Sequence, residues 1–367
     1  MELRRRSLEA MVGVGIAPRP DFWRGRRVLL TGHTGFKGAW LTQWLQRLGA
    51  ELTGISLPPQ TSPNLFSLID ADRLCASHFC DIRDVGRLAP LVQGSRPEIV
   101  LHLAAQPLVR ASYRDPLTTF TTNVIGSANL LEALRGLGGL RAVVVVTTDK
   151  VYRNVESGVP YSEADPLGGH DPYSASKAAC ELVVASYRDA FLADQGVAVA
   201  TARAGNVIGG GDWSEDRLIP DAVRAWLGGR VLSVRHPQAV RAWQHVLEPL
   251  AGYLSLAQQL AERPELSGAY NFGPDPRGCA SVRELIDMAR EAFGGGDLTV
   301  EQDAAGLHET GQLLLDPGKA AQLLGVVPRW PLPASVERTM RWYRAQSAGE
   351  SARALCDGDI TAFEALA

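Results

Sequence analysis

Short apolar runs alternate with longer amphipathic stretches along the first half of this chain. The apolar runs predict strands at 28–30, 52–56, 77–80, 98–103 and 142–146. Apolar residues at helical spacing predict helices over 39–48 and 115–134, and a third helix begins at Asp171-Pro172 and runs towards Gly196. The run 142–146 (AVVVV) is continuous, which is typical of a parallel strand covered on both faces. The alternation predicts an α/β fold with a doubly wound parallel sheet.

The turn after the first strand is rich in glycine. Residues 31–38 read TGHTGFKG, a G-x-x-G-x-x-G spacing that leads into the first helical pattern. Glycine lets a pyrophosphate approach the backbone N–H groups at a helix N-terminus, so this turn predicts a nucleotide site, with an ordinary strand-to-helix turn as the alternative. The cofactor-binding candidates here are Gly32, Thr34, Gly35, Phe36, Lys37 and Gly38.

Residues after the later strands extend this candidate site. Ser56 stands where an NAD-preferring fold usually has an acid for the ribose hydroxyls, but no basic residue is beside it for a 2′-phosphate, which favours NAD over NADP. Asp81 and Ile82 follow the third strand, where an acid could meet the adenine amino group. Asn123, also a candidate, is either an exposed helix residue or a buried amide that bonds to neighbouring backbone. The remaining cofactor candidates are Leu103, Ala104, Ala105 and Thr147.

Composition narrows the class of protein. The chain has 367 residues, of which 46% are hydrophobic, and can bury a sizeable core. Its net charge of −3 gives no reason to expect nucleic acid or an anionic membrane as a partner. The five cysteines have no metal-ligand spacing, so we expect no metal and free thiols in a reducing cytoplasm. No apolar run is long enough to span a bilayer, and residues 1–20 read as a loose tail.

Polar residues that could take part in catalysis occur at two places in the sequence. Thr147-Thr148-Asp149-Lys150 follows the fifth strand, where an open α/β sheet presents residues to ligands, although a solvated loop is the alternative. Tyr173 and Lys177 lie four apart and therefore on one helix face. A lysine beside a phenol stabilises tyrosinate, and a cationic nicotinamide would lower the pKa of the phenol further from its reference of about 10. Such a tyrosine can exchange a proton with a sugar hydroxyl during hydride transfer.

The order of these motifs resembles the extended short-chain dehydrogenase/reductase superfamily, and further stretches resemble the CDP-glucose 4,6-dehydratases of its NDP-sugar dehydratase group. The similarity runs from about Phe22 to Tyr343. The stretches that carry it are TGHTGFKG (31–38), SLPPQTSPNLF (56–66), QPLVRASY (106–113), TTDKVY (147–152), RAGNVIGGGDW (203–213) and RAWQHVLEPL (241–250).

The resemblance implies a redox-neutral cycle on a sugar nucleotide with NAD as cofactor. Tyr173, beside Lys177, takes the 4-hydroxyl proton while C4 hydride reduces NAD, water leaves across C5 and C6, and hydride returns to C6. Thr148 matches the hydroxyl that holds the 4-oxygen, and Asp149 matches the acid for the departing 6-hydroxyl. Lys150 stands where dTDP-glucose dehydratases have a glutamate base, as in the CDP-glucose group, and would act as a neutral base or as a cation that stabilises the enolate.

The same resemblance divides the chain and assigns its substrate side. We expect a Rossmann-type NAD-binding domain over 21–205, a smaller mixed sugar-nucleotide domain over 206–347, and a weakly specified tail over 348–367. The boundary leaves open that the chain crosses back between the two domains. Asn271-Phe272-Gly273 and His308-Glu309-Thr310 match late motifs on the substrate side. The substrate-binding candidates are Gln106, Ser112, Arg203, Asn206, Arg217, Leu218, Arg241, His245 and His308.

Two other functions stay open at this point. A sugar-nucleotide 4-epimerase or 4-reductase needs Tyr173 and Lys177 but no acid at the strand tip, and a non-catalytic nucleotide-binding scaffold needs none of these side chains. GDP-, UDP- or dTDP-linked sugars are alternatives to CDP-glucose. The apolar surface of helices 117–134 and 173–192 resembles a four-helix dimer interface of the superfamily, so we expect at least a homodimer.

Overall fold

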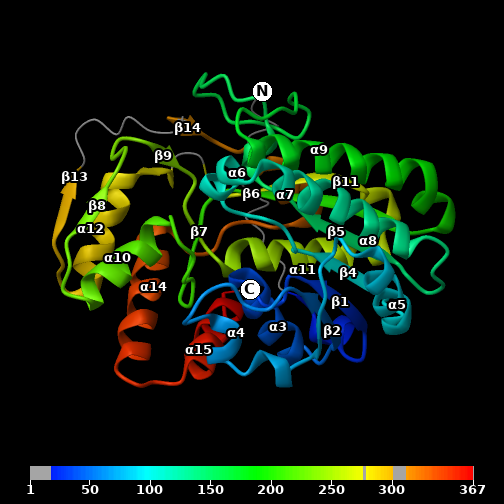
Figure 1. Ribbon diagram of the computed structural model, residues 1–367, viewed down its shortest axis with the longest axis horizontal. Coiled ribbons are helices and arrows are strands. Elements are labelled where there is room, and N and C mark those ends of the chain that lie inside the picture. Colours follow the sequence, from blue (N-terminus) through cyan, green and yellow to red (C-terminus); the bar gives the residue numbers. More distant parts are fainter. Residues whose placement is uncertain (1–17, 276–277, 301–310, 367) are drawn as a thin grey trace, which may run out of the picture.

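The computed structural model describes residues 18–275, 278–300 and 311–366. Its centre is a parallel sheet of seven strands in the order β11-β6-β5-β4-β1-β2-β3, shown in Figure 1. The strands are β1 (Arg27–Thr31), β2 (Glu51–Ser56), β3 (Ala76–Phe79), β4 (Ile99–His102), β5 (Ala142–Val146), β6 (Ala198–Ala204) and β11 (Gly268–Phe272). The five strands predicted from the apolar runs are all present, with bounds that differ by at most one residue at either end. The doubly wound fold is confirmed.

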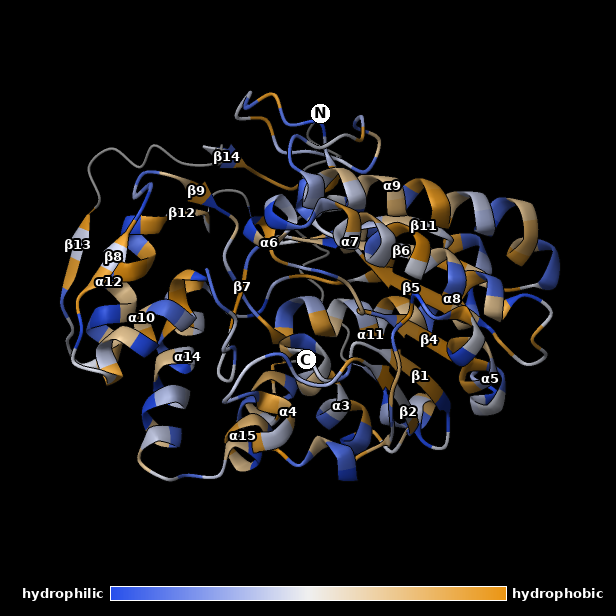
Figure 2. Cartoon of the chain, in the orientation of Figure 1, coloured by the Kyte–Doolittle hydropathy of each residue, from blue (hydrophilic) through white to orange (hydrophobic). Residues whose placement is uncertain are grey.

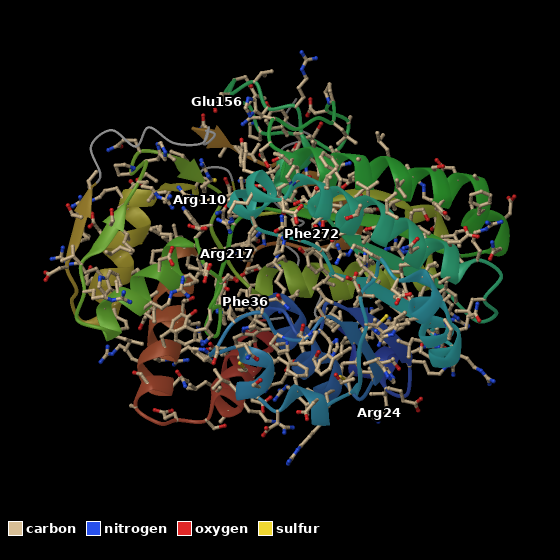
Figure 3. All side chains as sticks on the ribbon, in the orientation of Figure 1. Arg24, Phe36, Arg110, Glu156, Arg217 and Phe272 are labelled. Atoms are coloured by element: carbon tan, nitrogen blue, oxygen red, sulfur yellow. The ribbon has the colours of Figure 1, made fainter. Side chains whose placement is uncertain are left out.

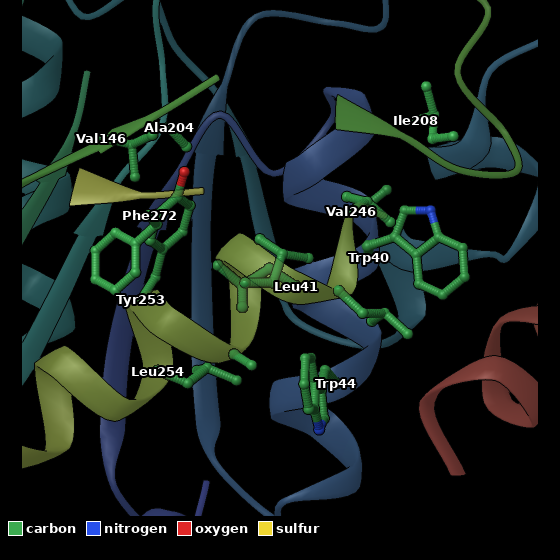
Figure 4. Close-up of a cluster of buried hydrophobic side chains, with 14 of the residues drawn as sticks. Trp40, Leu41, Trp44, Val146, Ala204, Ile208, Val246, Tyr253, Leu254 and Phe272 are labelled. Carbon is green, nitrogen blue, oxygen red and sulfur yellow. The ribbon is translucent and has the colours of Figure 1, made fainter. Parts of the chain in front are cut away.

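Helices cover both faces of this sheet. One face packs against α5 (Val85–Ser95), α8 (Ser127–Leu134) and α9 (Pro172–Tyr187), and the other against α3 (Phe36–Arg47) and α11 (Leu247–Glu262). Successive residues of β5 alternate between the two cores, because Val143 and Val145 belong to the first and Ala142 and Val144 to the second. This two-sided burial explains the continuous apolar run, which Figure 2 shows as an orange centre. The larger core contains the tryptophans of α3 in Figure 4.

The predicted helix starts at Asp115 and Asp171 are confirmed. The Asp115 carboxylate accepts the N–H of Thr118 at the start of α7 (Pro116–Phe120), and Asp171 accepts the N–H of Ser174 at the start of α9. The helix predicted over 115–134 consists of α7, a π-helical segment over Thr121–Gly126 and α8. Asn123 lies in the π-helical segment, a type of distortion that is frequent at functional sites.

A smaller lobe lies on the left of Figure 1, beside the carboxyl ends of the strands. Its helices are α10 (Leu218–Leu227), α12 (Val282–Phe293) and α14 (Leu332–Ser347). Its short strands are β7 (Val207–Ile208), β8 (Leu232–Val234), β9 (Val240–Arg241), β10 (Gln244–His245), β12 (Ala280–Ser281), β13 (Leu298–Val300) and β14 (Gln312–Leu313). Between these elements the chain returns to the sheet as α11 and β11, so residues 206–347 do not form one separate unit.

The prediction of a weakly specified tail over 348–367 is wrong. Residues Ala352–Glu364 form α15, which packs against α3 and α14 and buries Cys356, Ile360 and Phe363 completely. Asp359 pairs with Arg338 and Arg341 of α14, each at 2.9 Å. Local sequence gave no sign of this helix because its stability comes from the apolar face that it buries on distant helices.

No helix in the described ranges has both the length and the apolar character needed to cross a bilayer. The five cysteines are free thiols. Among the described residues, no group of three or more histidine, cysteine or carboxylate side chains is placed to hold a metal ion.

Candidate active site

A cavity of about 1180 Å³ lies at the carboxyl ends of the strands, between the sheet and the smaller lobe. Its walls come from the glycine turn, the ends of β2 to β5, the start of α9 and residues 204–221 and 232–235 of the lobe. Figure 3 shows Phe36, Arg110 and Arg217 around this region. A cavity of this size can hold two nucleotide-sized ligands end to end, which is more than a single small substrate needs.

The glycine turn is shaped for a ligand with phosphate groups. Gly32 has a φ of +79°, and a Cβ on it would lie 2.7 Å from the Ala104 nitrogen. A Cβ on Gly38 would lie 2.0 Å from the Gly32 carbonyl oxygen, so only glycine fits either position. Gly35 precedes α3 without a side-chain cap, which leaves the first N–H groups of α3 available at the cavity. A pyrophosphate would satisfy these donors, and the turn therefore fits a dinucleotide.

The part of the cavity beyond this turn is lined mainly by uncharged polar side chains. The Thr34 hydroxyl donates to the Leu57 carbonyl and also lies 2.8 Å from the Ser56 hydroxyl. Gln60, Thr61 and Asn64 line the same side. Asp81 lies in the wall as predicted, where the Arg83 guanidinium holds the pKa of its carboxyl below the usual range. The predicted candidates Ile82, Leu103, Ala104, Ala105 and Thr147 line the cavity too.

Three predicted catalytic side chains meet at the end of β5. The Thr148 hydroxyl donates to Asp149 Oδ1 at 2.9 Å, and it adjoins the phenol of Tyr173, where it opposes the rise in the pKa of that phenol. The three side chains are 6%, 3% and 8% exposed, respectively. Burial raises the pKa of Asp149, although Thr148 and the cations of Lys150, Arg241 and Lys37 oppose this effect. Asp149 is therefore a carboxyl group that holds its proton more firmly than an exposed one.

Gly205 leaves room for this carboxyl group. A Cβ on Gly205 would lie 3.1 Å from Asp149 Oδ2 and 3.2 Å from the Ala242 carbonyl oxygen. The backbone after β6 therefore contacts the acid directly. This role of Gly205 could not be predicted from the sequence, because the contact joins segments far apart in the chain.

Basic side chains lie around the cluster of Thr148, Asp149 and Tyr173. Lys177 is buried on the face of α9 that carries Tyr173, and its ammonium group donates to the Val146 carbonyl at 3.1 Å. Burial lowers its pKa. Lys150 lines the cavity beside Asp149. Burial, and then the charges of Arg217 and Lys177, lower the pKa of Lys37 to about 7. This end of the cavity thus combines an acid, a phenol and amines within one buried cluster.

The protein groups alone do not stabilise tyrosinate at Tyr173, although the sequence predicted that Lys177 would do so. Burial raises the pKa of Tyr173 to about 12, and the Thr148 hydrogen bond opposes this only in part. Lys177 is not among the groups that shift it. Its ammonium group is directed to a backbone carbonyl instead. The i, i+4 spacing places both side chains on one face, but tyrosinate needs a further positive charge from a bound ligand.

Known proteins share both this fold and this arrangement of motifs. Residues 28–273 match the model of the NAD dependent epimerase/dehydratase family. The chain belongs to this family. It is 44% identical over 336 residues to the CDP-glucose 4,6-dehydratase of Salmonella typhimurium, covering 90% of this chain and 94% of that one.

Two solved structures of the family superpose on most of this chain. A dTDP-glucose 4,6-dehydratase of Streptomyces venezuelae, solved with NAD bound, is 28% identical with a TM-score of 0.75 and covers 88% of this chain and 98% of its own. A UDP-glucose 4-epimerase of Stenotrophomonas maltophila, also with NAD bound, is 26% identical with a TM-score of 0.75 and covers 88% of this chain and 99% of its own. Both dehydratase and epimerase chemistries therefore occur on this fold.

The structure does not place Arg203 in the cavity wall, where the prediction of a substrate-binding residue would put it. Its guanidinium donates to both oxygens of Glu181, at 3.0 and 2.8 Å, and both side chains are buried under the sheet. The Glu181 carboxylate also accepts the hydroxyls of Thr147 and Thr201. A buried carboxylate needs this set of partners. The arginine that the motif suggested for a phosphate therefore holds α9 against β5 and β6.

We expect Arg203→Ala to lower the free energy of unfolding by about 3–5 kcal/mol, because it leaves Glu181 buried without its cation. Denaturation monitored by circular dichroism measures this loss. Arg283→Ala, which removes an exposed ion pair with Asp287 at 2.7 Å, is the matched control and should cost less than about 1 kcal/mol. An Arg203→Ala protein of unchanged stability but weakened substrate affinity would restore the original prediction.

Other predicted residues support the cavity from behind it. Asn123 is a buried amide that accepts the Gln106 N–H and donates to the Gln106 carbonyl and to the Ser176 hydroxyl. Of its two interpretations, the buried amide is confirmed. Ser112, also buried, accepts the Tyr173 N–H at 3.1 Å. Gln106, Ser112 and Asn123 do not line the cavity; they hold the loop after β4 against the start of α9.

The remaining substrate candidates divide in the same way. Asn206, Arg217, Leu218 and Arg241 line the lobe side of the cavity, as predicted. His245 does not, because it is completely buried between Trp40 and Trp330. Asn271 and Phe272 are buried too, with Asn271 bonded to the Tyr152 hydroxyl. His308 and its motif lie outside the described residues.

The structure adds cavity residues that the sequence analysis missed. Arg110 lies at the cavity on α6 (Val109–Arg114) and pairs at 3.7 Å with Asp216 of the opposite wall. Arg235 and Ser233 line the far end beside β8. Asp212, which pairs with Arg217 at 3.3 Å, holds that guanidinium in the wall. Arg110 and Asp212 lie in stretches that carried the family resemblance, so their motif membership was the available signal.

Proposed function

We propose that this protein converts CDP-D-glucose to CDP-4-keto-6-deoxy-D-glucose, with NAD as a recycled cofactor. The observation that carries the proposal is the buried cluster of Tyr173, Thr148 and Asp149 beside Lys150 in one cavity large enough for two nucleotides. The likeness to the Salmonella CDP-glucose 4,6-dehydratase supports the choice of substrate. The product forms by loss of water, so the enzyme is a carbon–oxygen lyase.

The residues of the sheet would hold the cofactor. The backbone of the glycine turn would bind the pyrophosphate, Ser56 and Thr34 the adenosine ribose, and Asp81 the adenine amino group. When bound, NAD would take a hydride from C4 of the sugar and return it to C6, and its positive charge would favour tyrosinate at Tyr173. The smaller lobe would hold the substrate, with Arg217 and Arg241 as donors to its diphosphate.

The side chains of the cluster have separate roles in this reaction. Tyr173 takes the proton of the 4-hydroxyl, and Thr148 holds the 4-oxygen. The resulting 4-keto group acidifies C5. Asp149 gives its proton to the 6-hydroxyl, which leaves as water. Lys150 accepts the C5 proton as a neutral amine or stabilises the enolate as a cation.

The acid at the strand tip separates this function from that of a 4-epimerase on the same fold. Epimerisation at C4 needs a proton acceptor for one hydroxyl, which Tyr173 alone supplies. Epimerisation needs no additional acid, such as a carboxyl group whose pKa is raised by burial. Asp149 has that property, which favours elimination.

A panel of nucleoside-diphosphate sugars tests the proposal. The protein incubated with NAD and CDP-glucose should form a keto sugar, with less product from the UDP-, GDP- and dTDP-linked sugars. Because the hydride returns to C6, turnover should need no added reductant and should leave no net NADH. A build-up of NADH in step with product would instead identify a dehydrogenase.

We further infer that the protein works as a homodimer in the cytoplasm. Large apolar side chains are exposed on α7, the π-helical segment Thr121–Gly126, α9 and a second π-helical segment that follows α9 (Arg188–Leu192), namely Leu117, Phe120, Ile125, Leu182 and Phe191. A second copy of the same helices would cover them in a four-helix interface. The free state of all five cysteines fits a reducing compartment.

A Leu117→Glu, Leu182→Glu double variant should therefore shift the protein from dimer to monomer at micromolar concentration, because it buries two charges in the proposed interface. Sedimentation velocity measures the shift. A Leu227→Glu, Val231→Glu variant, which changes two exposed apolar residues of the smaller lobe, should remain dimeric. A wild-type protein that sediments as a monomer would exclude the interface.

A further inference from the structure

One hydroxyl group joins the phenol and the acid of the buried cluster. Thr148 Oγ1 donates to Asp149 Oδ1 at 2.9 Å, and the same hydroxyl adjoins the phenol of Tyr173, where it opposes the rise in the pKa of that phenol. Because a hydroxyl has one proton, it can donate to one of these neighbours only while it accepts from the other. The backbone N–H of Lys150 donates to the same oxygen at 3.3 Å and fixes its position. The three side chains therefore form a continuous path for a proton.

At the end of the proposed reaction, Tyr173 holds a proton that Asp149 needs for the next turnover. Tyr173 starts as tyrosinate and ends as a phenol, because it keeps the proton of the 4-hydroxyl. Asp149 starts as a carboxylic acid and ends as a carboxylate, because its proton leaves with the 6-hydroxyl as water. The C5 proton is taken up and then replaced, so it cancels. The next turnover can begin only when Asp149 has regained a proton and Tyr173 has lost one.

We propose that Thr148 is the proton relay that restores the starting state: it accepts the proton of the Tyr173 phenol while its own hydroxyl proton passes to Asp149 Oδ1. In this step the O–H bonds of Tyr173 and Thr148 break, and new O–H bonds form on Thr148 and Asp149. No electron moves between groups and no other reactant is needed. This inference rests on the proposed dehydratase function.

The surroundings favour this internal route. Asp149 and Thr148 are almost completely buried, and the backbone at Gly205 lies close to Asp149 Oδ2. Burial disfavours the carboxylate that the elimination leaves behind, which favours return of the proton to Asp149. Burial also raises the pKa of the Tyr173 phenol to about 12, so the return depends on the positive charge of bound NAD, which would favour tyrosinate. The adjacent amine of Lys177 donates to the Val146 carbonyl rather than to either oxygen of the path.

A comparison of first and later turnovers tests the relay. Before mixing with CDP-glucose, Thr148→Val enzyme with NAD has time to reach its starting protonation state through solvent. We expect a burst of product close to one equivalent per active site, followed by a steady rate about 10²-fold or more below that of the first turnover. Thr148→Ser, which keeps the hydroxyl, should show no such burst. Thr148→Ala is a second hydroxyl-free variant with less bulk.

A small buffer acid supplies a second readout. Imidazole buffer should speed the later turnovers of Thr148→Val and Thr148→Ala but not those of the wild type, because it can carry the proton that the missing hydroxyl cannot. Equal slowing of first and later turnovers, without a burst or rescue, would show that Thr148 only positions the 4-oxygen and would overturn the relay. A wild-type protein that forms no keto sugar would instead overturn the dehydratase function.

Discussion

Tyr173→Phe is expected to abolish both the formation of keto sugar and the transient near-ultraviolet absorbance of reduced cofactor. The 4-hydroxyl then has no acceptor for its proton, so C4 cannot be oxidised and no later step can start. General-base catalysis of this kind contributes a factor of about 10²–10⁴, and we expect a loss near the upper end because Tyr173 is the first group to act. Stopped-flow absorbance and product analysis measure the two signals.

The tyrosine variant has a close control in the same helix. Tyr187→Phe removes a hydroxyl that bonds Glu132 on the surface, and it should leave both signals unchanged. The hydrogen bonds of the Tyr173 backbone to Ser112 and of its carbonyl to Ser176 do not involve the phenol, so the variant should keep its fold. Substantial product from Tyr173→Phe would assign the proton of the 4-hydroxyl to another base.

Asp149→Asn should separate oxidation of the sugar from the loss of water. The amide keeps the shape of the carboxyl group but has no acidic proton, so the 6-hydroxyl leaves slowly. We expect product formation to fall by about 10²–10⁴ while C4 oxidation continues, so that reduced cofactor accumulates on the enzyme. The absorbance that is brief in the wild type would then persist, and this is measured by the same stopped-flow experiment.

The expected dependence on pH has a defined sign. Burial raises the pKa of Asp149, so its acid form persists to higher pH than that of an exposed carboxyl group, and the elimination is lost as pH rises through that pKa. Asp149→Asn should remove this dependence. Asp357→Asn, which changes an exposed ion pair between α15 and α3, should leave the kinetics unchanged. Loss of C4 oxidation in Asp149→Asn would mean that Asp149 acts in the first half of the reaction.

Local features of the sequence were sufficient to predict much of the fold. The apolar runs placed β1 to β5, and Asp115 and Asp171 marked the starts of α7 and α9. These features depend on neighbouring residues only, because strand burial, capping and turn formation each involve a few adjacent positions. The family resemblance extended the same reasoning to the strand tip, where Thr148 and Asp149 do lie beside Tyr173.

Arg203 and the C-terminal helix show where this reasoning stopped. A motif arginine is equally suited to a phosphate and to a buried carboxylate, and only the packing of α9 on β6 brings Glu181 within reach. The apolar residues of α15 have few local signals, and their partners on α3 lie more than 300 residues away, as the hydrogen bond from Gln43 to Arg353 shows. Contacts at such separation cannot be recognised from one sequence.

The sequence by itself determined the order of the elements, the glycine turn and the chemical types of the reacting groups, because each depends on residue identity and short spacing. The tertiary structure alone decided which of those groups are buried, which contact each other and which only support the cavity. Burial sets the pKa of Asp149 and Tyr173, and the pairing of strands brings residues from distant segments to one edge of the sheet. Both effects depend on three-dimensional surroundings, which a linear pattern of residues does not specify.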